Sequence, residues 1–150
     1  MDVVKALTIS QPHASLIASG KKWVENRHWG TDYRGPLAIH AGQGEQYLMQ
    51  PWRYGHPTSR ILAVCRLVTC VDIRSDELLE NADELEKAGL TIVDVLTHEH
   101  ATGPVCWVLE DVRCLPDSVS ANGRPGLWDC GRPEVLKLAR MIANRESRKA

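Results

Sequence analysis

Residues 20–29, which read GKKWVENRHW, place charged side chains on a segment that strand geometry would normally bury. An extended backbone puts alternate side chains on one face, and here that face carries Trp23, Glu25, Arg27 and Trp29. Unpaired charges are too costly to bury in an ordinary core. Glu25 and Arg27 therefore either form a structural salt bridge or line a cleft in which a ligand completes their hydrogen bonds.

Lys22 lies in the turn that precedes this segment. A short apolar helix is expected to begin near Pro12 and to end at Gly20, because proline suits the first helical turn and glycine the left-handed stop. Strand periodicity does not fix the direction of a side chain in the following turn. Lys22 is therefore free to reach over the same face as Glu25 and Arg27.

The rest of the chain alternates between predicted strands and helices. The longest strand candidate is 60–74, where apolar side chains recur with period two. Other strands are expected at 5–10, 23–29, 37–41 and 104–115, helices after Ser75 and after Pro133, and turns at 116–131, while 90–100 is ambiguous between helix and loop. This order predicts a single α+β domain over 1–150, with a core at about 5–130 and a C-terminal helix at 133–150.

Composition limits the possible functions. The 150 residues are 43% hydrophobic and carry a net charge of −1, so a general coat of phosphate-binding charge is excluded. A basic C-terminus and five tryptophans still allow a local cationic or base-stacking surface. The N-terminus lacks the pattern of a signal peptide, and the sequence has no apolar run long enough to span a bilayer. We therefore expect a cytoplasmic protein with no membrane partner.

Three stretches of sequence together resemble the ASCH domain, a family of the PUA-like β-barrel superfamily. They are SQPHASLI at 10–17, the GxKxxExRxW pattern at 20–29 and YRGPLAIHA at 33–41. The likeness continues through 60–73, CWVLEDV at 106–112 and GLW at 126–128, so it covers nearly the whole chain. One departure is Pro12-His13, where many members of the family have Pro-Trp.

The resemblance implies a barrel of about five to six strands with peripheral helices, and a role in binding RNA or a modified nucleotide or nucleoside. By position, Lys22, Glu25 and Arg27 would be the residues of the cleft. An enzyme branch of the family hydrolyses the acyl amide of N-acetylated cytidine with Lys, Thr and Glu. Lys22 matches its lysine, but Glu25 stands at the threonine's position and removes the hydroxyl nucleophile.

Further candidate ligand contacts each have an alternative structural role. Gly42 begins a Gly-Gln-Gly sequence that suits either a small anion site or a plain turn. Trp52 and Arg53 suit a base-stacking platform or closure of the barrel end. Arg34 suits a phosphate contact or a turn hydrogen bond. The His-Glu-His sequence at 98–100 lacks a third ligand, so no metal or other cofactor is predicted.

The sequence therefore predicts a domain that binds RNA or a nucleotide-sized ligand in a polar cleft. Lys22 and Arg27 would bind phosphate or base acceptors, Glu25 would orient Arg27 or accept from an exocyclic amine, and Trp29 would stack on a base. The alternative is a hydrolase of acylated cytidine or of RNA, in which Lys22 and Glu25 would be catalytic. A protein-interaction module with a vestigial cleft is a third possibility.

Overall fold

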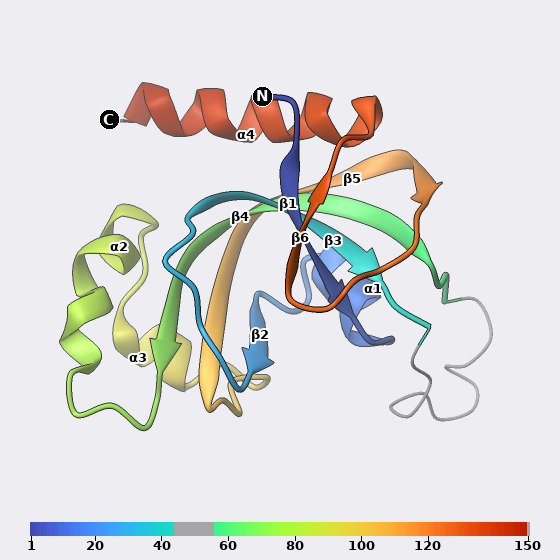
Figure 1. Ribbon diagram of the computed structural model, residues 1–150. Helices are drawn as coiled ribbons and strands as arrows, with labels where there is room; N and C mark the ends of the chain where they lie inside the picture. The colour runs from blue at the N-terminus through green and yellow to red at the C-terminus, as the bar shows by residue number, and fades with distance from the viewer. Residues whose placement is uncertain (44–55, 150) are drawn as a thin grey trace.

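The computed structural model describes residues 1–43 and 56–149, and Figure 1 shows their arrangement. The strands are β1 (Val4–Ile9), β2 (Val24–Arg27), β3 (Gly35–Ala41), β4 (Arg60–Asp72), β5 (Val105–Ser120) and β6 (Leu127–Cys130). The helices are α1 (His13–Ala18), α2 (Ala82–Lys87), α3 (Ile92–Leu96) and α4 (Pro133–Lys149), with the 3₁₀ helix η1 (Leu78–Asn81) before α2. The α+β class is confirmed.

The strands form one mixed sheet in the order β2-β5-β4-β3-β1-β6. Among these described strands, β1 and β3 pair in parallel, and the other neighbours are antiparallel. Strands β2 and β6 are the two edges of this sheet, so the sheet is open and the predicted closed barrel is wrong. The sheet does not close because β1 pairs with β6, and not with β2, on the side away from β3. That pairing runs only from Val4 to Leu7. Between β1 and β2, side chains bridge the opening instead of a backbone ladder.

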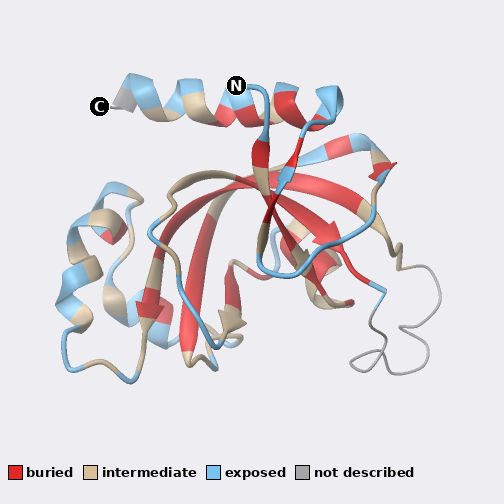
Figure 2. Cartoon of the chain, viewed as in Figure 1, coloured by how far each residue is buried: buried red, intermediate tan, exposed pale blue. Residues whose placement is uncertain are grey.

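Both faces of the sheet are buried, as Figure 2 shows for the central strands. Side chains of β1 and β3 alternate between two cores: Leu7 and Leu37 lie in the core with α1, whereas Ala6 and Ala38 lie in the core with α4. Helix α4 covers its face of the sheet with a buried stripe that includes Val135, Ala139 and Ile142. This stripe follows the helical spacing expected from the sequence.

The segment expected to form a helix after Ser75 is less regular than predicted. It contains η1 and the short α2, and it ends at Gly89, which has the left-handed φ of +74°. The ambiguous stretch that follows contains α3, whose N-cap Thr91 forms a capping box with Asp94. These helices and β4 share a third apolar cluster, in which Leu85 and Val95 are fully buried.

The prediction of a turn-rich segment at 116–131 is wrong for 116–120 and 127–130, which are strand. Strand β5 continues to Ser120 because its last residues pair with the start of β4, Val119 opposite Ile61. Proline in this stretch is tolerated because the register between β4 and β5 shifts here. A further strand, β6, follows and pairs with β1. Among the described residues, no helix is long and apolar enough to cross a membrane.

Candidate functional site

The turn between α1 and β2 fixes the position of Lys22. Gly20 takes the left-handed φ of +80° that ends α1. The backbone N–H groups of Lys21 and Lys22 then donate to the carbonyl oxygen of Leu16, at 3.0 and 3.1 Å. The chain is thereby folded back against the end of the helix. Lys21 is exposed there, whereas the side chain of Lys22 is buried.

Lys22, Glu25 and Arg27 form one ion-pair network. The Lys22 ammonium donates to Glu25 Oε1 at 3.1 Å, and Arg27 Nη2 lies 3.2 Å from Glu25 Oε2. The side chains of Lys22 and Glu25 are only 2% and 8% exposed, while that of Arg27 is 25% exposed. One carboxylate therefore lies between two cations, which leaves this buried group with a net positive charge.

His13, the first residue of α1, completes the network. Its Nδ1 lies 2.9 Å from Lys22 Nζ. Burial lowers the pKa of His13 below its ordinary value of 6.5, and the neighbouring Lys22 charge lowers it further. A neutral imidazole accepts at Nδ1 from the ammonium and carries its own hydrogen on Nε2. The contact therefore joins a charged donor to a neutral acceptor.

These side chains line a cavity of about 410 Å³ at the opening between β1 and β2, called the Lys22 cavity below. Thr8, Ile9 and Ser10 form its other wall. Asn26 and Thr102 line its remaining part. The Asn26 carboxamide accepts from the backbone N–H groups of Thr102 and Gly103 and donates to the carbonyl oxygen of His100, so it holds this loop against β2.

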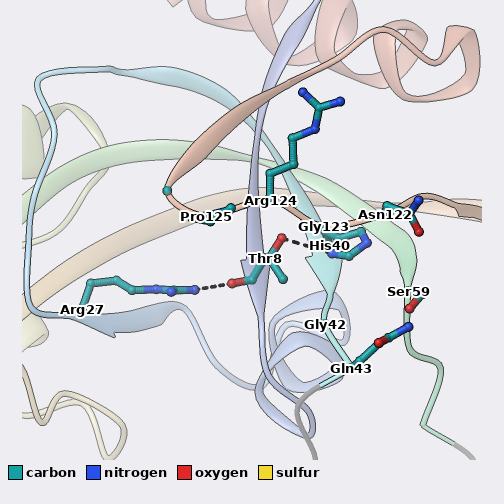
Figure 3. Close-up of a pocket in the computed structure, with 11 residues that line it drawn as sticks. Thr8, Arg27, His40, Gly42, Gln43, Ser59, Asn122, Gly123, Arg124 and Pro125 are labelled. Carbon is teal, nitrogen blue, oxygen red and sulfur yellow. Dashed lines mark hydrogen bonds between the residues drawn. The ribbon is translucent and has the colours of Figure 1, made fainter.

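A second cavity, of about 480 Å³, lies on the other side of Thr8 and Arg27 and is called the His40 cavity below. Figure 3 shows how its walls come from β1, β3 and the loop after β5. Its polar lining includes His40, Gln43, Ser59 and Asn122. The two cavities share Thr8 and Arg27 as lining residues. Arg27 thus contributes to both spaces.

The other residues singled out from the sequence lie in several places. Trp29 packs edge-on against Trp107, is 38% exposed and lines neither cavity. The Arg34 guanidinium binds Glu84 and the carbonyl oxygens of Thr31 and Tyr33, away from the Lys22 cavity. Gly42 lines the His40 cavity. Trp52 and Arg53 lie outside the described residues. Trp23, expected on the charged face, packs instead against His98.

Sequence reasoning did not assign His13, Thr8 or Thr102 to the site. His13 was marked only by its departure from the family's Pro-Trp pattern. Thr8 and Thr102 carried no signal, because their roles depend on where β1 and the loop before β5 end in space. Among residues 1–43 and 56–149, no cluster of three or more His, Cys, Asp or Glu side chains has the arrangement to hold a metal ion.

The fold and this site together define a small α+β domain with a charged cleft at the open edge of a mixed sheet. The sequence matches the ASCH domain family over residues 7–115, and the chain belongs to that family. No curated protein sequence matches the chain.

A solved structure agrees with this fold. The crystal structure of ASCH from Zymomonas mobilis superposes with a TM-score of 0.50 and 18% sequence identity, over 92% of this chain and 94% of that one. A mutant of the same Zymomonas mobilis protein gives a TM-score of 0.48 at 17% identity, over 93% of this chain and 96% of that one. At this level of identity the first similarity supports the fold alone.

Proposed function

We propose that this ASCH domain binds RNA or a nucleotide-sized ligand in the Lys22 cavity. The observation that carries the proposal is the network of buried Lys22 and Glu25 with half-buried Arg27, which lines a cavity and keeps a net positive charge. Burying an ion costs several kcal/mol even in a real protein environment, and good pairing is needed to offset it. A purely structural salt bridge needs one cation for one carboxylate, but this site has two cations, Lys22 and Arg27, for the single carboxylate of Glu25.

The hydrogen-bonding capacity of the two cations also favours a ligand. An ammonium has three donors, and His13 and Glu25 account for two of those of Lys22. A guanidinium has five, and the described contacts of Arg27 involve Nη2 alone. The buried Nε–H of Arg27 has no acceptor among the described residues. Anionic or carbonyl oxygens of a nucleotide would pair these remaining donors.

In this proposal each residue has a distinct role. Lys22 donates to a base carbonyl or a phosphate at the floor of the cavity. Glu25 holds both cations and is placed to accept from an exocyclic amine. Arg27, the more exposed cation, binds phosphate at the rim. Trp29 lies outside the cavity lining, and we propose it only as a stacking surface for a flanking base.

Titration of short single-stranded RNA at two salt concentrations tests the proposal. Lys22→Met removes the charge and keeps most of the side-chain volume, and we expect it to weaken binding about tenfold or more, the scale of a lost charge-assisted hydrogen bond. Lys21→Ala is the control, because Lys21 is the exposed neighbour of the same type. Equal affinity in folded Lys22→Met and wild-type protein would reject binding in this cavity.

A hydrolase is the second candidate, favoured by the pairing of the Glu25 carboxylate with the Lys22 ammonium in the cavity. Glu25 would take a proton from water, which attacks the acyl carbon of an N-acylated cytidine. The C–N bond then breaks, the amine nitrogen receives the proton, and the products are a carboxylic acid and cytidine. Lys22 would stabilise the oxyanion that forms on the way. In RNA cleavage, the same pair would transfer protons at a phosphodiester.

Incubation with acylated cytidines and with RNA tests this second candidate. Turnover that is lost in both Glu25→Gln and Lys22→Met, and kept in Lys21→Ala, supports a hydrolase. Product formation no faster than the protein-free blank argues against it and leaves the binding proposal unaffected.

A further inference from the structure

The Lys22 cavity and the His40 cavity are neighbours that meet at Arg27. Each has the volume of a small-molecule site, about 410 and 480 Å³. Thr8 and Arg27 line both. The Arg27 guanidinium is held there by donating from Nη2 to the Thr8 carbonyl oxygen at 2.6 Å, as Figure 3 shows. A ligand that occupied both cavities would therefore pass directly over a guanidinium.

Arg27 has the donors that such a ligand needs. Its Nη1 and Nε groups make no hydrogen bond with the described residues, and the Nε–H is buried. An unpaired buried donor costs about 1–3 kcal/mol. A small rotation of the guanidinium toward a bridging anion would pair this donor. Phosphate suits the position, because guanidinium donors match the geometry of phosphate oxygens.

The walls of the His40 cavity are polar, and no carboxylate is among its described lining residues. Gln43, Ser59 and Asn122 offer neutral donors and acceptors of the kind that read base edges. Arg124 adds a second cation. In Figure 3 its guanidinium extends away from His40, on the exposed rim. This lining suits an uncharged base next to a backbone phosphate.

The floor of the His40 cavity is fixed by a chain of hydrogen bonds. Trp128 Nε1 donates to Thr8 Oγ1 at 3.1 Å, and Thr8 Oγ1 lies 3.2 Å from His40 Nδ1. His40 Nε2 lies 2.6 Å from the Ala121 carbonyl oxygen, which only accepts, so Nε2 carries a hydrogen. Gly123 packs so closely here that a Cβ would lie 2.7 Å from Thr8 Oγ1. The space above this floor is therefore preformed.

We propose that the ligand is a single-stranded RNA that spans both cavities, with one nucleoside in each and the connecting phosphodiester on Arg27. The proposal rests on the binding function proposed above and specifies its ligand as a dinucleotide step, not a free nucleoside or mononucleotide. Arg124 binds the next phosphate along the strand.

Calorimetric titration with three probes tests this inference: a nucleoside, its monophosphate and the matching dinucleoside monophosphate. The wild-type protein is expected to bind the dinucleoside monophosphate about tenfold more tightly than the mononucleotide, the scale of one further set of polar contacts. The double variant Asn122→Ala/Arg124→Ala alters the His40 cavity alone, and both residues are exposed on a loop. It should lose this tenfold advantage and keep the wild-type affinity for the nucleoside.

The matched control is Asn144→Ala/Arg148→Ala, which removes the same two side-chain types from exposed positions of α4. It should retain the tenfold advantage. A longer oligonucleotide should also show a shallower salt dependence with Asn122→Ala/Arg124→Ala, by about 0.7 in the logarithmic slope for one lost phosphate contact on a single strand.

The possible failures are distinguishable. Equal affinity of the wild-type protein for the mononucleotide and the dinucleoside monophosphate overturns the two-cavity ligand and leaves nucleotide binding in the Lys22 cavity intact. So does an unchanged tenfold advantage in Asn122→Ala/Arg124→Ala. Failure of the folded wild-type protein to bind any of the three probes or the longer RNA overturns the proposed function together with this inference.

Discussion

The Arg27 guanidinium reaches across the opening of the sheet and donates from Nη2 to the Thr8 carbonyl oxygen at 2.6 Å. The pairing of β1 with β6 ends at Leu7, and Thr8 is the next residue of β1. A side chain therefore satisfies a carbonyl group where a closed barrel would have a backbone ladder. The same side chain lines both cavities, so Arg27 both bridges the open side of the sheet and contributes to the site.

Replacement of this bridge should destabilise the protein. Arg27→Met removes the hydrogen bond to Thr8 and the ion pair to Glu25, but it also removes the unpaired Nε–H. The net loss in the free energy of unfolding should be about 1–2 kcal/mol, below the upper range for hydrogen bonds to charged groups. Urea denaturation measures it, with the exposed Arg148→Met as control. An unfolding midpoint equal to that of the wild type would mean that Arg27 does not stabilise the opening of the sheet.

A second prediction concerns pH. Burial is the main reason that the pKa values of His13 and His98 lie below their ordinary value of 6.5. The unfolded chain therefore binds more protons than the folded one as the pH falls below 6.5. These histidines contribute stability above that pH, and their contribution is lost as the pH falls through their folded pKa values. Thermal unfolding from pH 7.5 down to 5 should show a decreasing midpoint, with the steepest loss below about 6.5.

The variant His13→Gln/His98→Gln isolates this effect, because glutamine does not titrate. Its unfolding midpoint should change less over the same pH range than that of the wild type. The exposed His28→Gln serves as the control and should keep the wild-type slope. Parallel pH profiles for the wild type and the double variant would show that other groups cause the loss of stability.

The sequence predicted the parts of this fold that follow from local pattern. Period two in the sequence identified β4, although both of its faces are buried, and helical spacing identified α4, which buries one regular face. The end of β5, strand β6 and the open sheet depend on pairing between distant segments, which local pattern does not encode. Val119 joins the sheet because Ile61 lies opposite it, although its own surroundings are rich in turn-forming residues.

The same distinction holds for the site. Lys22, Glu25 and Arg27 are close in sequence, and strand and turn geometry brings them together as expected. The contribution of Thr8 depends on the position of a different strand. Arg34 had the right chemistry for a ligand contact, but Glu84, fifty residues away, pairs with it. The presence of a second cavity beside Arg27 follows from the packing of the loop after β5, which no motif indicated.

Close packing of that loop gives a third prediction. In Gly123→Ala, the new Cβ would lie 2.7 Å from Thr8 Oγ1 and 2.9 Å from His40 Cε1, so the loop must move. We expect a loss of about 1–3 kcal/mol in the free energy of unfolding, the usual cost of overpacking. The NMR signal of the Trp128 indole N–H should also shift, because its acceptor is Thr8 Oγ1.

Gly131→Ala is the control for this change. Its Cβ would meet its nearest atom, the Asp2 carbonyl oxygen, at an ordinary 3.5 Å. We therefore expect Gly131→Ala to leave stability and the Trp128 indole signal close to those of the wild type. The same result for Gly123→Ala would mean that the loop tolerates a methyl group and does not fix the floor of the His40 cavity.

The buried pair of Lys22 and Glu25 gives the last prediction. Glu25→Met leaves the Lys22 ammonium, 2% exposed, without its carboxylate, and the free energy of unfolding should fall by about 3–5 kcal/mol. Lys22→Met should cost less, because Glu25 keeps Arg27 as its partner. The double variant Lys22→Met/Glu25→Met should be more stable than Glu25→Met, since no unpaired buried ammonium remains. Chemical denaturation of all four proteins measures the coupling.

The coupling free energy between Lys22 and Glu25 also indicates why this buried ion pair is present. If the apolar double variant is as stable as the wild type, the two charges do not serve stability, and binding of a ligand becomes the reason to retain them. The same protein should then bind RNA weakly while remaining folded. Purely additive losses from the two single changes would mean that Lys22 and Glu25 do not interact, and would contradict the ion-pair network on which the proposed site is built.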